Sequence, residues 1–313
     1  MGVGAWSAII PAMAKARLVA SFLSEDQEFQ VMQAADARLA AERAGLELEV
    51  VFADNNAVLQ IQQLFQHVHA PEAERPAGII VETVVGEGLE RVARNAARAG
   101  IGWVLLNRNV PYLEVLRKEH PKIPISMVTS DQLGIGRIQG RQFRALLPEG
   151  GSVLYVQGPP DTSAAKERLQ GMQEAILGTK IQTKVLTAEW TEASAEKAVM
   201  AWLRLKTSEG FNPGLVGCQN DAMALGAKKA LTAHRKEWGR LPFTGCDGLP
   251  EGGQRLVNMQ QLAATIVVPS NAGPAVELLA AHLRTGEPVP PRLVLAGRSH
   301  PPESQLGAKT AQG

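Results

Sequence analysis

The sequence has few cysteines and few aromatic residues. Its 313 residues include two cysteines, Cys218 and Cys246, which is far short of a disulfide framework. No Cys or His cluster has the short spacing of a zinc site, and the six histidines are scattered. The composition therefore predicts two free, buried thiols, with a single disulfide as the alternative. Neither a metal nor a cofactor is expected.

Two further features are lacking, namely an excess of one charge and long apolar runs. Lys and Arg number 32 against 31 for Asp and Glu, a formal net charge of +1, so a nucleic-acid partner is not expected. No stretch reaches about 18 unbroken apolar residues, the length that a membrane-spanning helix needs. With 45% apolar residues in a chain of this length, the sequence predicts a globular protein of two lobes.

The N-terminus leaves two interpretations open. Residues 3–14 are apolar and end in a small-x-small pattern, as in a secretory signal, yet no Lys or Arg precedes them. The segment is either a trimmed signal peptide, which implies a periplasmic protein, or the start of a cytoplasmic one.

Short apolar runs of strand length alternate with helix-period stretches along the whole chain, which is typical of an α/β fold with parallel sheets. The runs expected in a first sheet are 17–23, 46–53, 78–84, 102–107 and 125–130. Those expected in a second sheet are 152–158, 183–189, 214–220, 242–248 and 263–269, with 292–297 closing the series. A first helix is expected over about 27–44, with Ser24 and Gln27 as a capping box and Gly45 as its stop.

Polar side chains follow the strands of both series. They are Asp26, Gln27, Asn107, Arg108, Asp161, Trp190, Asn220 and Asp247. Because the carboxyl ends of parallel strands meet at one crevice, we expect these residues to form one site. Hydrogen-bonding groups beside an aromatic plate suit a polyhydroxylated small molecule.

Enzyme signatures are weak by comparison. The run GIGRIQG (134–140) is similar to a dinucleotide fingerprint, but its third glycine comes one residue late and its glycines fall within a helix. Close helix packing is the better interpretation. No catalytic triad or Cys-His grouping is visible by motif, so we do not expect an enzyme.

Five segments carry a family resemblance: TSAAKERLQGM (162–172), AEW (188–190), CQNDAMALGA (218–227), GCDGLPEGG (245–253) and LAATI (262–266). They closely resemble ribose- and galactose-type periplasmic binding proteins, whose fold also forms the core of LacI/GalR repressors. The resemblance covers residues 17–297 and implies two Rossmann-like lobes joined by three crossings, near Ser130, Val268 and Pro290. The expected lobes are 15–130 plus 269–291 and 131–268 plus 292–300, followed by a disordered tail at 301–313.

The resemblance also implies roles for individual residues. Arg168 is expected to fork onto ligand oxygens, Asn220 and Asp247 to bind hydroxyls, and Trp190 to stack on the ligand. On the first lobe the corresponding residues are Asp26, Gln27, Phe29, Asn107 and Arg108. Simpler roles stay open: helix caps for Asn220 and Asp247, a surface ion pair for Arg168, and core packing for Trp190 and Phe29. For Asp131 a helix cap is the expected role.

Three positions depart from the family pattern. Asn107 stands where an Asp is frequent, Val268 where a Gln is frequent, and Gln30 where a second aromatic is common. Loss of an Asp beside Arg108 and Arg168 predicts a cleft biased toward positive potential and hence a sugar acid, unless Glu25 or Asp26 restores neutrality. A neutral sugar is the alternative.

Together these observations predict a monomeric binding protein that closes on a sugar or sugar derivative and presents it to a membrane permease or receptor. The alternative is a cytoplasmic, repressor-like sensing domain. Only about 16 residues precede the first strand, so a helix-turn-helix reader of DNA is not expected there.

Overall fold

The computed structural model describes residues 16–86 and 88–309. The apolar segment 3–14, on which the two interpretations of the N-terminus depend, lies outside these residues. Within the described part, none of the helices combines the length and apolar character needed to cross a bilayer. Cys218 and Cys246 are both buried free thiols, as the composition predicted.

The first lobe is built on a six-stranded parallel sheet with the order β11-β5-β4-β3-β1-β2. Its strands are β1 (Arg17–Phe22), β2 (Glu47–Phe52), β3 (Gly78–Val81), β4 (Gly102–Leu106), β5 (Ile125–Ser130) and β11 (Arg292–Leu295). Successive side chains of β1 point to opposite faces, so that Leu18 and Ala20 join one apolar cluster and Val19 the other.

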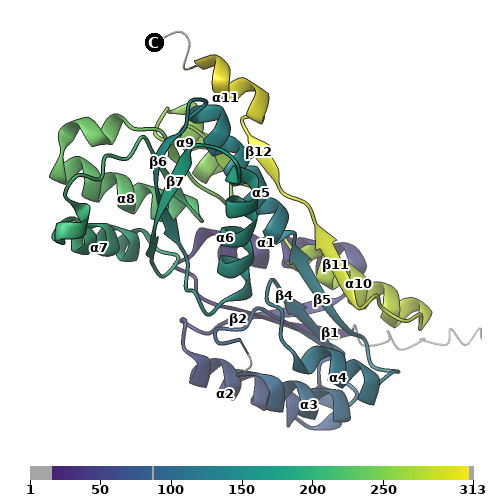
Figure 1. Ribbon diagram of the computed structural model, residues 1–313. Coiled ribbons are helices and arrows are strands. Elements are labelled where there is room, and N and C mark those ends of the chain that lie inside the picture. Colours follow the sequence, from purple (N-terminus) through teal and green to yellow (C-terminus); the bar gives the residue numbers. More distant parts are fainter. Residues whose placement is uncertain (1–15, 87, 310–313) are drawn as a thin grey trace, which may run out of the picture.

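Helices cover both faces of this sheet. On one face α1 (Glu28–Ala44) packs beside α10 (Ala272–Thr285), and on the other lie α2 (Ala57–Val68), α3 (Glu90–Arg98) and α4 (Tyr112–Glu119). A short 3₁₀ turn, η1 (Glu72–Glu74), follows α2. In Figure 1, α2, α3 and α4 lie below this sheet and α1 lies above it.

The second lobe has a four-stranded parallel sheet in the order β7-β6-β8-β9. Its strands are β6 (Gly151–Gln157), β7 (Ile181–Thr187), β8 (Leu215–Cys218) and β9 (Phe243–Thr244), and β10 (Thr265–Val267) pairs separately with β12 (Arg298–His300). The helices are α5 (Gln132–Leu146) and α6 (Ser163–Ile176) on one face, and α7 (Glu192–Leu203) and α8 (Asp221–His234) on the other. The remaining short helices are η2 (Lys206–Ser208), η3 (Lys236–Arg240), η4 (Pro250–Gln254) and α9 (Arg255–Asn258).

Three chain crossings join the lobes. One follows β5 at Ser130, and one spans 268–271 between β10 and α10. The third prediction, near Pro290, is wrong. The strand β11 pairs in parallel with β5 in the first lobe, so the chain crosses only at 296–297 before β12. The alternation of apolar residues predicted a strand there but carries no information on which sheet edge it joins.

The expected disorder of the tail is wrong for residues 303–309, and residues 310–313 lie outside the described residues. Residues Glu303–Lys309 form the helix α11, and Leu306 is only 2% exposed within the apolar cluster of α5 and β6. Its salt bridge from Glu303 to Arg141 adds a polar contact at the same interface. Figure 1 shows this C-terminal segment running from β11 along one side of the molecule to α11. One buried leucine in a polar stretch is a weak sequence signal, which explains the error.

Helix ends follow the sequence in part. α1 starts at Glu28 and is closed by Gly45 in the left-handed conformation, with a φ of 69°. The capping box does not form, since the Ser24 hydroxyl instead accepts a hydrogen bond from the Asp26 N–H. Asp131 caps α5 by accepting from the Gly134 N–H, as expected.

The glycines of GIGRIQG allow close helix packing, as the sequence predicted. A Cβ atom on Gly136 would lie 2.1 Å from the Arg168 carbonyl oxygen, and one on Gly140 would lie 2.6 Å from the Ala175 Cβ. Gly171 makes the reciprocal approach from α6 to the Leu133 carbonyl oxygen, at 2.1 Å. The backbone of α6, which carries Arg168, is therefore set by glycines on α5.

Replacing Gly136 with Ala is expected to destabilise the protein by about 1–3 kcal/mol, because the added methyl group overlaps backbone atoms that cannot rotate away. Gly307→Ala is the matched control: its Cβ meets an ordinary contact at 3.7 Å in a helix, where Ala is favoured over Gly. The free energy of unfolding from urea titration measures both. Equal stability of the two variants would contradict the packing argument.

Candidate functional site

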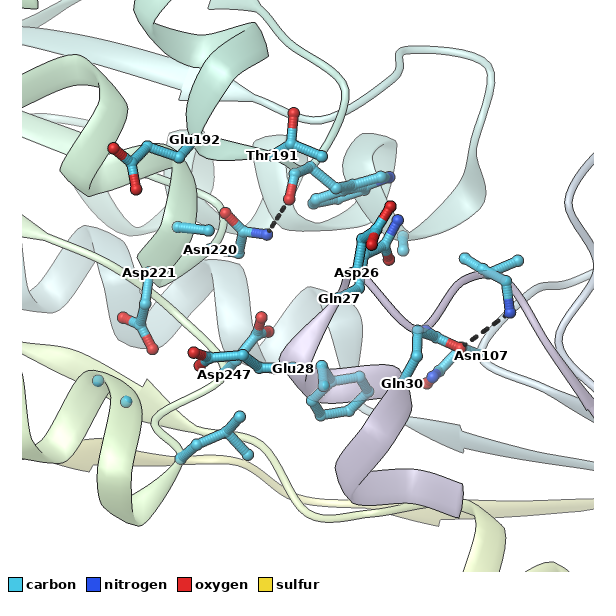
Figure 2. A pocket seen from close by; sticks show the side chains of 18 of the residues that line it. Asp26, Gln27, Glu28, Gln30, Asn107, Thr191, Glu192, Asn220, Asp221 and Asp247 are labelled. Atoms are coloured by element: carbon cyan, nitrogen blue, oxygen red, sulfur yellow. Dashed lines mark hydrogen bonds between the residues drawn. The ribbon is translucent and has the colours of Figure 1, made fainter. Parts of the chain in front are cut away.

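A cavity of about 400 Å³ lies between the lobes. All nine residues that the sequence predicted for the site line it: Asp26, Gln27, Phe29, Asn107, Arg108, Arg168, Trp190, Asn220 and Asp247. Figure 2 shows the cavity from close by, with side chains of both lobes converging on it. The convergence arises because eight of them follow the carboxyl end of a strand or open the next helix, while Arg168 lies in the second turn of α6.

Three of these residues have backbone conformations that glycine normally adopts. Asn107, Trp190 and Asp247 have φ angles of 58°, 59° and 98°. Such conformations cost about 1–3 kcal/mol each in a non-glycine residue and are concentrated at functional sites. Asn and Asp tolerate the left-handed region better than a bulky aromatic does, so the cost is greatest at Trp190.

Trp190 and Arg168 form one wall of the cavity. The Arg168 guanidinium carbon lies 5.7 Å from the Trp190 ring centroid. On the other side of the ring, a Cβ atom on Gly158 would come within 2.3 Å of ring carbons, so only glycine leaves room for the indole there. Trp190 is partly buried against the second-lobe core, so it both packs and presents ring surface to the cavity.

Arg168 is 7% exposed and held by its own lobe. Its Nε donates to Gln132 Oε1 at 2.7 Å, and its Nη1 donates to the Gln219 carbonyl oxygen at 2.5 Å. The alternative of a surface ion pair is wrong, because these partners are neutral and buried. The remaining guanidinium hydrogens are free to meet a ligand.

Asn220 is a helix cap, as one of the two sequence interpretations held. Its Oδ1 accepts from the Met223 N–H at 2.8 Å, and its Nδ2 donates to the Trp190 carbonyl oxygen at 2.8 Å. The second contact ties the strained Trp190 backbone to α8. One amide hydrogen of Asn220 remains for a ligand.

Glu82, which the sequence analysis missed, is the most highly coordinated carboxylate of the cavity. It follows β3 and is 6% exposed. Its Oε2 accepts from three side-chain amides, those of Gln30 at 3.2 Å, Gln33 at 2.8 Å and Asn107 at 3.3 Å. Its place directly after a buried strand run was the available signal, which the family motifs did not cover.

The Asn at position 107 is explained by this neighbour. Asn107 Nδ2 donates to Glu82, and its Oδ1 accepts from Asn271 Nδ2 at 2.6 Å. More distant contacts to the same oxygen come from the Ser130 N–H and from Gln132, both at 3.5 Å. An Asp here would place two carboxylates in contact, so the carboxylate missing at 107 has its counterpart at 82.

This network also reaches the crossings between the lobes. Ser130 ends the first crossing strand, and Asn271 lies at the end of the second crossing. Asn271 accepts from the Ser130 hydroxyl at 3.5 Å and donates its N–H to Gln33 at 3.2 Å. The floor of the cavity and two of the three crossings are thus parts of one hydrogen-bonded unit.

Arg108 has few hydrogen-bond partners for a buried charged group. It is 8% exposed, and its Nη1 donates a long hydrogen bond to the Val84 carbonyl oxygen at 3.4 Å. Burial lowers the pKa of Arg108, and the negative charges of Glu82 and Asp161 act in the opposite direction. The guanidinium therefore has unused donors that line the cavity.

The first-lobe loop contributes both polar and apolar groups. Asp26 is exposed at the rim, and Gln27 donates to Asn55 Oδ1 at 3.3 Å. Phe29 packs across the cleft against the second-lobe cluster that contains Val268, so it is at once a packing residue and part of the lining. Gln30 has both ends of its amide committed, to Glu82 and to the Leu23 N–H.

The expected positive potential is wrong. The lining contains two arginines, Arg108 and Arg168, and neither Lys nor His. Against these stand seven carboxylates: Asp26, Glu28, Glu82, Glu192, Asp221, Asp247 and Glu251. Glu82, which the family motifs do not cover, already replaces the missing Asp. The cavity is acidic, which disfavours a sugar acid.

Burial and mutual repulsion raise the pKa values of two of these acids. Burial raises the pKa of Asp247 to about 7, with Arg168 lowering it and Glu82 and Glu28 raising it further. Burial also raises the pKa of Asp221, with repulsion from Asp247 in support. Asp221 is nevertheless anchored, since it accepts from the Thr265 hydroxyl at 2.7 Å and the Gly248 N–H at 2.8 Å.

The pairing of Asn107 with Glu82 is testable by exchange. Asn107→Asp replaces a donor by a second carboxylate and is expected to destabilise the protein by about 1–3 kcal/mol at neutral pH. Repulsion raises the folded-state pKa of the pair above its unfolded value, so the loss is full at high pH and shrinks as pH falls. Urea titrations at about pH 8 and about pH 5 measure this difference.

The double variant Asn107→Asp, Glu82→Gln serves as the control, because it restores one amide and one carboxylate at the contact. We expect it to recover most of the lost stability. A double variant that loses the sum of the two single effects would show that the residues do not interact.

Comparison with known proteins agrees with this architecture. Residues 19–288 match the periplasmic binding protein domain family. The ribose import binding protein of Escherichia coli is 28% identical over 264 residues, which cover 84% of this chain and 82% of the relative. The galactofuranose-binding protein of the same organism is 25% identical and covers 94% and 91%.

Solved structures show the same fold. The Caulobacter myo-inositol binding protein, bound to myo-inositol, superposes with a TM-score of 0.78 at 20% sequence identity and covers 96% of this chain and 97% of its own. The superposition shows that the two-lobed α/β fold of the present chain is that of the solved structure. The match over most of its length shows that the chain belongs to the periplasmic binding protein domain family.

Proposed function

We propose that this protein binds a polyhydroxylated small molecule, a sugar or cyclic polyol, in the cavity between its lobes. The observation that carries the proposal is the lining itself: donors and acceptors from both lobes face one cavity, with Trp190 forming a wall. The relatives named for ribose, galactofuranose and myo-inositol support it, since all three ligands are rich in hydroxyl groups.

The chemistry of the lining suits such a ligand. Hydroxyl groups both donate and accept, and the cavity offers acceptors at Glu82 and Asp247 and donors at Arg108 and Arg168. The C–H faces of a sugar ring pack on aromatic surface, which Trp190 offers. We therefore assign ligand contact to the residues predicted from the sequence and add Glu82 to them.

Closure of the two lobes is the proposed mechanism. A ligand resting on one lobe completes its hydrogen bonds only when the other lobe arrives, so contacts of the closed state drive the equilibrium. Changing the open-to-closed ratio from 1:99 to 99:1 needs about 5.5 kcal/mol of differential binding. A few charge-assisted hydrogen bonds, at about 1.5–3 kcal/mol each, are of the required size.

Transport is the proposed purpose. The curated relatives named above include an import binding protein, which favours delivery to the permease of an ABC-type transporter in the periplasm over the repressor-like alternative. Each half of the cavity comes from the same chain, so a monomer suffices for binding. Because the relatives are binding proteins, we propose that the bound molecule is released unchanged.

Small-angle scattering with a panel of neutral sugars and inositols tests the proposal. The expected result is a smaller radius of gyration with those members that also raise the melting temperature. Tight binding without compaction would contradict the closure mechanism. A panel that causes neither stabilisation nor compaction would contradict the proposed ligand class.

Trp190→Ala tests the stacking role. We expect about 10- to 100-fold weaker binding, measured by calorimetry, because the ligand loses its aromatic wall. The melting temperature without ligand should fall much less than the affinity does, because Trp190 is only partly buried and Ala keeps the same positive φ. Trp202→Phe, in the core of the same lobe, is the control and should leave affinity unchanged. A large stability loss with unchanged affinity at Trp190 would show that it is only a core residue.

A further inference from the structure

Three carboxylates gather at one side of the cavity. Glu28 opens α1 in the first lobe, Asp221 opens α8, and Asp247 follows β9. Figure 2 shows Glu28 and Asp247 together, with Asp221 nearby. Each of the two second-lobe acids has its pKa raised in part by repulsion from Glu28, so the three lie within electrostatic reach of one another.

The protein supplies little positive charge to this group. Among the seven acids of the lining, the described part of the chain pairs only Glu251 with a cation within 4 Å, namely Arg255 at 3.8 Å. Arg168 attracts Asp247, but two of its nitrogens are already bonded to Gln132 and to the Gln219 carbonyl. The carboxylate of Asp247 itself accepts no hydrogen bond from any described group.

A metal ion does not account for the group. Within the described residues, no set of three or more His, Cys, Asp or Glu side chains is close enough to hold one. We therefore look for the charge that relieves this repulsion on the ligand itself, where a cationic group would be attracted to the acids.

Glu82 supplies a second, independent observation on the other side of the cavity. Its carboxylate is more than nine-tenths buried, and all three of its hydrogen bonds go to Oε2. Its Oε1 makes no hydrogen bond to a described group, and this oxygen is not completely buried. This oxygen is thus an unused acceptor in the lining.

We propose that the ligand is a polyhydroxylated molecule that carries a protonated amine, and that Asp247 and Glu28 hold the ammonium group. This inference rests on the proposed function, since it names the ligand class of the same cavity. Hydroxyl groups of the ligand form hydrogen bonds with Glu82, Arg108 and Arg168, and its ring stacks on Trp190. Closure brings Glu28 and Asp247, from opposite lobes, onto the same group.

An ammonium group fits this arrangement better than a hydroxyl. Ionised carboxylates only accept hydrogen bonds, and an ammonium group only donates, so it can bond to both acids at once. A hydroxyl donates one hydrogen and leaves the negative charges uncompensated. An anionic group adds to the repulsion.

The titration of Asp247 gives the proposal a pH signature. Its pKa is raised to about 7 by burial, with Glu82 and Glu28 adding to the rise, Arg168 opposing it, and Asp221 as a further acid in reach. An ammonium ligand binds the ionised form, so a proton competes with it below about pH 7. Affinity for the amine is expected to fall as pH drops through that value, and affinity for a neutral polyol is not expected to follow the same course.

Matched ligand trios test the ligand class. We name D-glucose, D-glucosamine and N-acetyl-D-glucosamine, the same three forms of galactose, and myo-inositol with its amino and acetamido derivatives. The acetamido forms retain the nitrogen but lose the charge. In calorimetry at neutral pH, at least one amine should bind about tenfold or more tightly than both of its partners.

Asp247→Asn tests the site of the ammonium group, because Asn keeps the shape and tolerates the positive φ. The variant should abolish the preference, so that the amine binds no more tightly than its neutral partners. Glu149→Gln, an exposed acid in the turn before β6, changes net charge equally and should retain the preference.

The outcomes separate this inference from the proposed function. Neutral polyols that bind with compaction, while no amine binds better, overturn the amine proposal and leave the function standing. A preference for the amine that survives Asp247→Asn overturns the assigned site. Absence of binding and compaction with every trio overturns the ligand class on which both proposals rest.

Discussion

The buried carboxylate of Glu82 is the constraint on which the cavity depends. A carboxylate that is 6% exposed must be hydrogen-bonded, and Glu82 recruits amides from Gln30, Gln33 and Asn107 for that purpose. Two of these amide side chains also position a further residue. Gln33 and Asn107 both bond to Asn271, which lies where the chain crosses between lobes. One buried charge thereby connects the cavity floor to the segments that cross between the lobes.

In the second lobe, the close approach of two helix backbones, not a buried charge, positions the cavity residues. Gly136 and Gly171 let α5 and α6 approach until backbone atoms meet, and this contact positions Arg168. From there Arg168 reaches Gln132 at the start of α5 and the carbonyl after β8. Trp190 lies between the guanidinium and Gly158. The cavity wall is rigid because each of its members has its conformation imposed by a neighbour.

Charge distinguishes this cavity from the one that family motifs suggested. Motif matching placed two arginines in the cleft and one strongly assigned aspartate. The acids that reverse the balance come from positions outside the motifs, such as Glu28 in the first turn of α1 and Glu82 after β3. A ligand enters a site whose acids already repel one another, so its own charge affects both affinity and the titration of Asp247.

Local patterns were sufficient to predict much of the fold. Apolar runs of strand length located the strands, because a parallel sheet buried on both faces requires them, and the rule of converging carboxyl ends brought Asn107, Trp190, Asn220 and Asp247 to one cavity. The sequence also located Gly45 and Asp131 as helix ends, since capping is a short-range interaction.

Tertiary structure alone decided the remaining features, because they depend on contacts between residues far apart in the chain. The edge that β11 joins, the docking of α11 through Leu306, and the pairing of Glu82 with Asn107 are of this kind. The charge of the cavity belongs with them. An acid's position in the sequence does not tell whether its carboxylate faces solvent, a helix end or a ligand, and that environment determines its electrostatic effect.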